Sequence, residues 1–93
     1  MGLGYALREG LRFKGEEITD VNFGTYEIPR FSWLPKIETH ILDDENAPPQ
    51  GGGEPAIVTM GAVIANAIYD AVGARLFELP MIPGRVKEAM NKG

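Results

Sequence analysis

Apolar residues recur at every fourth position near the start of the chain, as Leu3, Leu7 and Leu11. This spacing places them on one face of a helix, so it predicts a short amphipathic helix over residues 2–12. Two short runs that alternate between apolar and polar residues follow, and a glycine-containing turn at residues 15–16 separates them. Alternation on both sides of such a turn predicts a β-hairpin.

The middle of the chain changes character twice. Residues 24–35 contain two prolines and three aromatic residues, which predicts an extended, packed connection because proline cannot donate to a β-ladder. Residues 36–42 then place isoleucine and threonine on one side and glutamate and histidine on the other, which predicts a half-buried strand. Residues 43–53 combine acidic residues, prolines and glycines, so they predict a loop throughout.

A long apolar helix is predicted from Pro55 to about Val72, because its apolar residues recur with helical spacing and Gly73 follows as a stop. A second proline-fixed connection comes next, and residues 84–90 can form a last short helix. The predicted fold is therefore α+β, with a small antiparallel sheet packed against one long helix and short helices at both ends.

Composition narrows the function classes. The chain has 93 residues, which fit a single domain spanning 1–93. A net charge of −4 and scattered lysines and arginines argue against nucleic-acid binding. Without cysteine, the chain has no disulfide and no iron–sulfur ligand of its own. No apolar run approaches the roughly 20 residues that span a bilayer, and no signal-peptide pattern is present. We therefore expect a cytoplasmic protein without a membrane span, and a periplasmic parent complex stays open.

The glycine-rich loop before the long helix carries the candidate chemistry. Gly51, Gly52 and Gly53 permit positive φ and the close approach of a ligand or another backbone. Pro55 suits the first helical position, which places Glu54 at or beside the N-cap. On spacing alone Glu54 could be a favourable anion at a helix start, a general base beside a bound cofactor, or part of a phosphate-binding loop. The last ranks lowest, because the known phosphate-loop glycine spacings are absent.

Other polar residues offer weaker candidates. His40 has no second ligand at metal-binding spacing, and the acidic residues 43–45 lack the further oxygen ligands of a calcium loop. Ser32 has no neighbouring base that could activate it. We therefore expect no metal site formed by this chain alone.

The order and spacing of four elements resemble one known family. They are GTYEIP at 24–29, LPKIE at 34–38, GEP at 53–55 and ANAI at 65–68. With the opening GLGYAL they cover essentially the whole chain. The chain resembles the C-terminal segment of the molybdenum-cofactor-binding large subunit of the xanthine dehydrogenase and aldehyde oxidase family. This family of molybdenum hydroxylases includes bacterial carbon monoxide, isoquinoline and nicotinate dehydrogenase subunits.

The resemblance implies a role for each residue of the glycine loop. Glu54 corresponds to the family's active-site base, which accepts a proton while an electron-poor carbon of the substrate is hydroxylated. Gly52 and Gly53 would let the backbone pass close to the molybdopterin cofactor, so they are the cofactor-binding candidates. The implied partners are the remainder of the large subunit, which holds most cofactor and substrate contacts, and iron–sulfur and flavin subunits.

Two functions follow from these patterns. Because the family's subunits are many times longer, we expect the chain alone to bind no cofactor and to be inactive. The first hypothesis is a C-terminal piece of a molybdenum-dependent oxidoreductase that supplies Glu54 to an active site completed by other chains. The alternative is a non-catalytic, stand-alone or truncated fragment that only folds and self-associates as a homo-oligomer.

Overall fold

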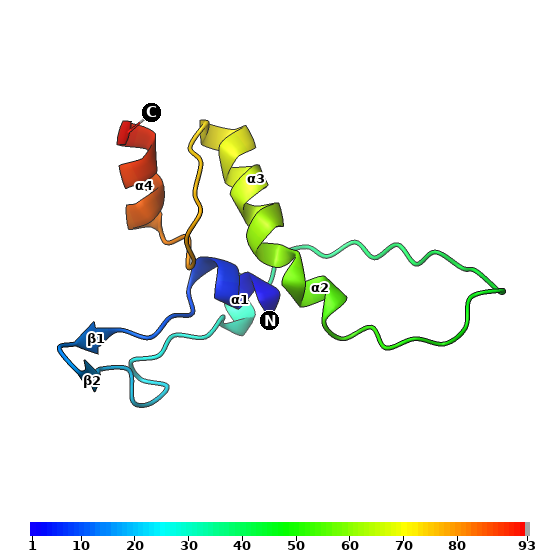
Figure 1. The fold of residues 1–93 in the computed structure, drawn as a ribbon, viewed down its shortest axis with the longest axis horizontal. Helices are drawn as coiled ribbons and strands as arrows, with labels where there is room; N and C mark the ends of the chain where they lie inside the picture. Colours follow the sequence, from blue (N-terminus) through cyan, green and yellow to red (C-terminus); the bar gives the residue numbers. More distant parts are fainter. Residues whose placement is uncertain (93) are drawn as a thin grey trace.

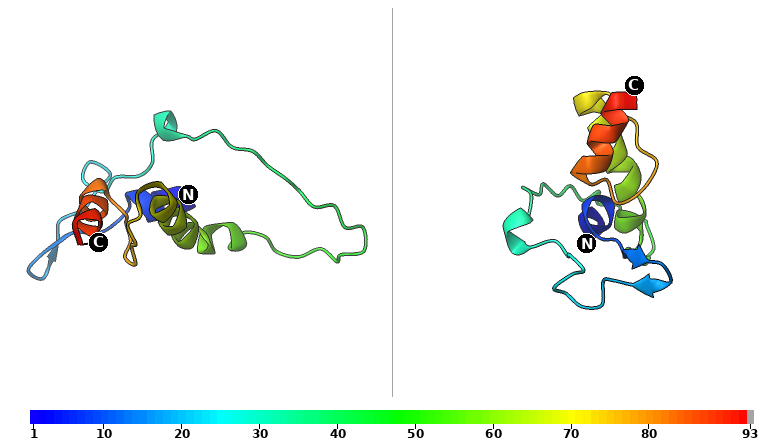
Figure 2. Two further views of the ribbon diagram at one scale, coloured as in Figure 1. Left: turned by 90° about the horizontal axis from the view of Figure 1, so that it is seen from above. Right: turned by 90° about the vertical axis from the view of Figure 1, so that its left-hand side faces the viewer.

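The computed structural model describes residues 1–92 as short helices and one hairpin, joined by long extended segments (Figure 1). In chain order the elements are α1 (Gly2–Leu7), β1 (Phe13–Lys14), β2 (Glu17–Ile18), the 3₁₀ turn η1 (Phe31–Trp33), α2 (Pro55–Val58), α3 (Met60–Val72) and α4 (Pro83–Lys92). The three longer helices lie together, whereas the hairpin and the segment between η1 and α2 extend away from them on opposite sides (Figures 1 and 2). The α+β class is as the sequence predicted.

The small core lies where α1, α3 and the connection to α4 meet. Its buried residues are Ala65, Ala74, Leu76 and Met81, and partly buried apolar side chains of α1, α3 and α4 pack around them. The backbone N–H of Met81 donates to the carbonyl of Ala6 at 2.7 Å, which fixes the connection to α1. In the described part of the chain no large side chain is fully buried, so this core is thin.

Helix α1 buries its small residues more deeply than its leucines. Gly2, Gly4 and Ala6 are buried, while Leu11 lies beyond the end of the helix and is 52% exposed. A Cβ atom at Gly2 would collide with the side chain of Met60, and one at Gly4 would overlap a proline ring. Other segments of the same chain therefore pack closely against the glycine face of α1. The predicted helix over 2–12 was too long. Of its predicted leucine face, Leu7 packs against the core as a partly buried side chain, whereas Leu11 lies outside the helix.

The hairpin forms where the alternating pattern placed it. Phe13 pairs with Ile18 and Lys14 pairs with Glu17 in antiparallel register. The turn uses Gly15 with a φ of 63°, a left-handed conformation that favours glycine. The hairpin points away from the helices (Figure 1). The predicted packing of the sheet on the long helix is therefore wrong, and α1 packs against α3 in its place.

The long helix begins and ends as the sequence predicted, with one interruption. Pro55 is its first residue, and Thr59 separates α2 from α3. Gly73 closes α3 with a φ of 71°, and its N–H donates to the carbonyl of Tyr69 at 2.8 Å. Over 18 residues, Pro55–Val72 is long and apolar enough to cross a membrane, with 6% of that window buried. The expectation that the chain has no apolar run long enough to span a bilayer was wrong. The test concerns length and composition alone, and the buried core helices of large proteins are equally apolar.

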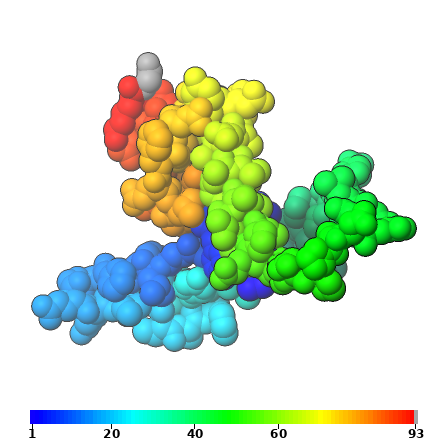
Figure 3. All heavy atoms as spheres, turned by 45° about the vertical axis from the view of Figure 1, so that its right-hand side comes forward, coloured from blue at the N-terminus to red at the C-terminus, as the bar shows by residue number. Residues whose placement is uncertain are grey.

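The segment between η1 and α2 forms an extended arm, which we define as residues 34–54. It leaves the helical cluster, turns near residues 45–47 and returns to α2 (Figures 1 and 3). Every residue of the arm is exposed. The strand predicted over 36–42 forms no ladder in the structure, because no other described strand lies beside it.

The chain is far more open than a free-standing domain of its size. Its radius of gyration is 16.7 Å, whereas a compact chain of this length would have about 12 Å. Its accessible surface is 8090 Å², whereas a folded monomer of this mass would expose roughly 5300 Å². Large apolar side chains such as Phe31 and Leu42 are more than nine-tenths exposed. Much of this surface is apolar and uncovered within the chain.

Candidate functional site

Glu54 lies at the end of the arm, where the chain enters α2. It is the N-cap residue, and its carbonyl accepts hydrogen bonds from the N–H groups of Ile57 and Val58 at 2.9 and 3.0 Å. Its carboxylate makes no capping hydrogen bond and is exposed. The backbone of Glu54 therefore starts the helix, while its side chain has no structural partner among the described residues.

The three glycines before Glu54 have no structural requirement within the chain. None of Gly51, Gly52 and Gly53 has a positive φ. A Cβ atom built on any of them would meet nothing within 4 Å. Neither a left-handed turn nor a close contact inside the chain explains this costly run of glycines.

The weaker candidates lie on the same arm or beside it. His40 and Ser32 are exposed, and the Asp44 carboxylate accepts a hydrogen bond from the N–H of Asn46 at 3.0 Å, as in a local turn. Among residues 1–92, no three His, Cys, Asp or Glu side chains cluster closely enough to hold a metal ion. The structure thus brings none of these residues to Glu54.

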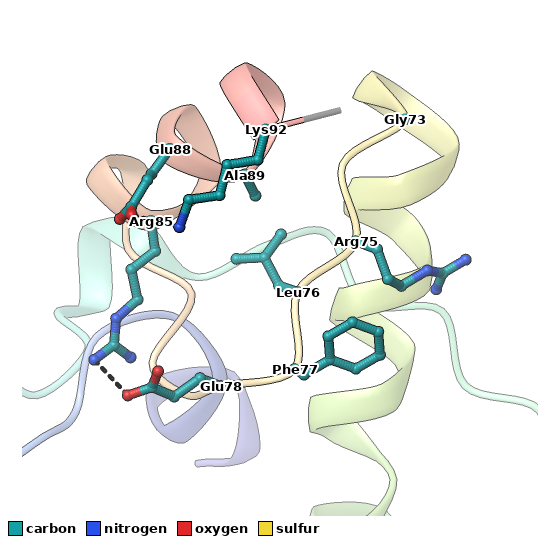
Figure 4. A pocket seen from close by; sticks show the side chains of 9 residues that line it. All are labelled: Gly73, Arg75, Leu76, Phe77, Glu78, Arg85, Glu88, Ala89 and Lys92. Atoms are coloured by element: carbon teal, nitrogen blue, oxygen red, sulfur yellow. Dashed lines mark hydrogen bonds and ion pairs between the residues drawn. The ribbon is translucent and has the colours of Figure 1, made fainter.

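Two hollows lie elsewhere. One of about 800 Å³ opens between the end of α3, the following connection and α4 (Figure 4). At its edge Arg85 pairs with Glu78 at 3.0 Å, and Phe77 stands at the opposite side (Figure 4). A second hollow, of about 510 Å³, lies beside α1 and is lined by arginines, among them Arg8. Arg8 pairs with Glu27 at 3.3 Å, so part of that charge is already neutralised. Glu54 lines neither hollow.

The buried carboxylate of Asp20 joins the two ends of the hairpin. It was not singled out from the sequence. The Asp20 side chain is 1% exposed and accepts hydrogen bonds from the Arg12 backbone N–H at 2.7 Å and from Arg12 Nη2 at 2.7 Å. These Arg12 hydrogen bonds hold the pKa of Asp20 below its usual value, although burial opposes the shift. The only sequence signal was an acid at the end of an alternating run, which is weak.

A second polar contact holds the next segment to the residues just after α1. The Tyr26 hydroxyl donates to Glu9 Oε1 at 3.0 Å. Burial, together with this acidic neighbour, raises the pKa of Tyr26 above its usual value. Polar contacts thus fix residues 20–29 to the segment that follows α1, whereas the arm that carries Glu54 has no comparable anchor.

Comparison with known proteins gives several relatives that match most of the chain. No family model matches it. A nicotinate dehydrogenase subunit of Pseudomonas putida is 40% identical over 85 residues, which are 91% of this chain and 7% of that protein. The aldehyde oxidoreductase molybdenum-binding subunit PaoC of Escherichia coli is 35% identical over 88 residues, 87% of this chain and 12% of that protein.

The name of a third relative refers to a cofactor other than molybdenum. The membrane-bound aldehyde dehydrogenase [pyrroloquinoline-quinone] of Gluconacetobacter polyoxogenes is 33% identical over 92 residues, 99% of this chain and 12% of that protein. The chain thus spans about a tenth of the length of the relatives it matches.

Proposed function

We propose that this chain supplies the active-site base of a molybdenum-dependent oxidoreductase, because it is homologous, over most of its length, to part of a nicotinate dehydrogenase subunit and of the molybdenum-binding subunits of a xanthine dehydrogenase and an aldehyde oxidoreductase. In this proposal the base is Glu54, and Gly52 and Gly53 lie against the cofactor. The homology carries the proposal, since it extends over 91% of the chain at 40% identity in one relative.

Two features of the loop fit this role. The Glu54 carboxylate is exposed and unused by helix capping, so it is available to a substrate that another polypeptide positions. The backbone of Gly51–Gly53 has open space where side chains would stand. Close approach of a ligand or another backbone would account for glycines that nothing inside the chain requires.

The chemistry divides between the cofactor and this chain. The molybdenum cofactor, held mainly by the rest of the subunit, supplies the two-electron oxidation of the substrate. Glu54 accepts a proton at its carboxylate, and the bare glycine backbone lets that carboxylate approach the reacting atoms. A positioned general base typically contributes about 10²–10⁴ in rate. Alone, the chain would have neither cofactor nor substrate pocket and would be inactive.

The partners follow from the same reasoning. The remainder of the molybdenum-binding subunit is the first, and a relative named as subunit gamma of a dehydrogenase complex supports further subunits. Iron–sulfur and flavin subunits would carry electrons away, since this chain has no cysteine to ligate a cluster. We place the complex in the cytoplasm. The substrate is left open, because its contacts would lie outside this chain.

One observation favours the alternative of a self-associating fragment. The exposed apolar surface would drive association with any complementary face, including that of a second copy. Sedimentation of the purified chain over a hundredfold concentration range distinguishes the two. A clean monomer would remove the alternative, whereas a stable closed dimer that hides Glu54 would count against the catalytic role.

Complementation tests the catalytic proposal. The matching nicotinate dehydrogenase subunit of Pseudomonas putida is expressed without its homologous segment, together with its partner subunits and with this 93-residue chain. The removed segment, supplied separately, is the positive control. Nicotinate-dependent dye reduction, bound molybdenum and co-purification are measured in parallel. We expect the chain to restore all three.

Substitution of Glu54 separates catalysis from assembly. Glu54→Gln should lower activity by about 10²–10⁴ while molybdenum content and co-purification stay unchanged. Glu45→Gln, in the same arm, is the matched control and should keep full activity. Full activity of Glu54→Gln would refute the proposed role. A quinone in place of molybdenum in the active complex would refute the cofactor assignment.

A further inference from the structure

We propose that residues 36–42 are an edge strand that pairs with a β-sheet in the remainder of the molybdenum-binding subunit. This inference rests on the proposed function, because that function supplies the partner. The inference goes beyond the proposed function because it names the surface through which the chain joins the rest of the enzyme. It concerns the outgoing half of the arm, which stands clear of the rest of the molecule (Figure 3).

The side chains of this segment already alternate as in a sheet. Lys36 Nζ and Glu38 Oε1 form an ion pair at 3.2 Å, which places these two polar residues on the same side of an extended backbone. On the opposite side of the backbone lie Ile37, which is 67% exposed, Thr39, and Ile41, which is 84% exposed. Leu42, the last residue of the segment, falls on the polar side. A half-apolar, half-polar extended segment is typical of a strand that covers a core on one face.

The backbone of this segment lacks the hydrogen bonds that its pattern calls for. No backbone N–H or carbonyl between residues 36 and 42 bonds to another group in the described chain. Buried backbone groups are nearly always paired, so burying the isoleucines would require partners for this backbone too. A neighbouring strand would meet both needs at once.

The ends of the segment match those of an edge strand. Pro35 precedes it, and proline is tolerated at the first position of a strand, where no ladder bond is lost. Asp43, Asp44 and Glu45 follow it and favour solvent. The seven residues between them would span about 23 Å, an ordinary strand length.

The exposed area points to the rest of the subunit and not to a second copy. The chain exposes 8090 Å², roughly 2800 Å² more than a folded monomer of its mass. A partner in a standard interface covers only about 800 Å² of each protein. One second copy would leave most of the excess uncovered, whereas a subunit of which this chain is 7–13% can enclose it.

Amide hydrogen exchange in the complementing complex tests the pairing. The probe is the Pseudomonas putida nicotinate dehydrogenase subunit without its homologous segment, bound to the full chain carrying a ¹⁵N label. Exchange is read residue by residue after quenching. We expect alternate amides between 36 and 42 to slow by about two orders of magnitude on binding, because alternate N–H groups of an edge strand face its partner.

A pair of lysine substitutions tests the apolar face. Ile41→Lys places a charge on the face that should be buried, and we expect binding at least about tenfold weaker. Glu38→Lys makes the same side chain on the polar face and is the matched control, with binding changed by less than about threefold. Binding is measured by co-purification and titration, independently of activity.

The outcomes separate this inference from the proposed function. If the complex forms and is active, but residues 36–42 stay unprotected and Ile41→Lys binds like the parent, the strand is refuted while the catalytic proposal stands. If the removed Pseudomonas segment restores the complex and this chain does not, both are refuted. Protection of 36–42 in the chain alone that grows with concentration would assign the strand to a second copy, against this inference.

Discussion

Leu76 and Phe77 are neighbours in sequence with opposite environments, and this contrast gives a sharp test of the structure. Leu76 is 8% exposed and belongs to the core cluster, whereas Phe77 is 91% exposed at the edge of the larger hollow (Figure 4). We predict that Leu76→Ala destabilises the isolated chain strongly and that Phe77→Ala leaves its stability nearly unchanged.

The magnitude follows from the size of the core. Burying a leucine and then truncating it to alanine typically costs about 2–5 kcal/mol. A domain of this length has about 5–14 kcal/mol of stability in total. Because the core around Leu76 is thin and has no large fully buried side chain, the chain should lie near the lower end of that range. Leu76→Ala should therefore remove half or more of the stability.

Thermal unfolding followed by circular dichroism measures the effect. At about 4–8 °C per kcal/mol for a domain of this size, Leu76→Ala should lower the Tm by at least about 10 °C. The change for Phe77→Ala should lie within about 0.5 kcal/mol, because exposed positions contribute little. Equal shifts for the two variants would refute the arrangement of the core.

The same pair also reports on the assembled enzyme. If the rest of the subunit covers the face that carries Phe77, then Phe77→Ala should weaken co-purification with the complementing subunit. Truncating a buried aromatic anchor at an interface typically costs about 2 kcal/mol or more. If Phe77→Ala leaves the stability of the free chain unchanged but weakens binding to the complementing subunit, the surface around Phe77 is one that the parent protein buries.

Four further predictions concern local structure. The stability that Asp20 contributes is present above its usual pKa of 3.8 and is lost as pH falls through its lowered pKa, so urea unfolding of Asp20→Asn and the parent should converge in acid. Gly61→Ala should stabilise α3 by about 0.5–1 kcal/mol, because its Cβ would make an ordinary 3.5 Å contact. Gly73→Ala should destabilise by about 1–2 kcal/mol, because its φ is 71°. In an absorbance titration, Tyr26→Phe should remove a tyrosine ionisation that lies above the usual tyrosine pKa, since the pKa of Tyr26 is raised.

Local sequence signals predicted the elements whose cause is local. The long helix was found because its apolar spacing, Pro55 and Gly73 all act within a few residues. The hairpin was found because a turn with Gly15 lies between two alternating runs. Both predictions needed only the chain's own backbone preferences.

Tertiary contacts explain the failures. The leucine spacing in α1 suggested a buried leucine face. In the structure, distant segments of the same chain pack most closely against Gly2 and Gly4, and the leucine spacing gave no sign of these contacts. The Arg12–Asp20 pair joins the two ends of the hairpin and leaves no periodic signal. The strand at 36–42 did not form, because a strand needs a neighbour as well as an alternating pattern.

The position of Glu54 was predictable, but its catalytic geometry was not. Proline after glycines located it at a helix start, and the structure agrees. The role as a base came from the family resemblance and remains a proposal, because nothing within the described chain gives the carboxylate a partner or a pocket.

The distribution of burial argues that any catalytic competence belongs to the assembly. The buried residues of the chain lie in α1, in α3 with the connection that follows it, and at the hairpin base. A catalytic side chain must be held within about 0.5 Å of its productive position by surrounding packing. The arm that carries Glu54 is exposed throughout and has no such packing of its own. The proposed strand would fix one half of the arm, and a closely approaching ligand or backbone would fix the glycines at its other end. Glu54 would therefore acquire its position from the same contacts that complete the enzyme, so assembly and base positioning would be a single event.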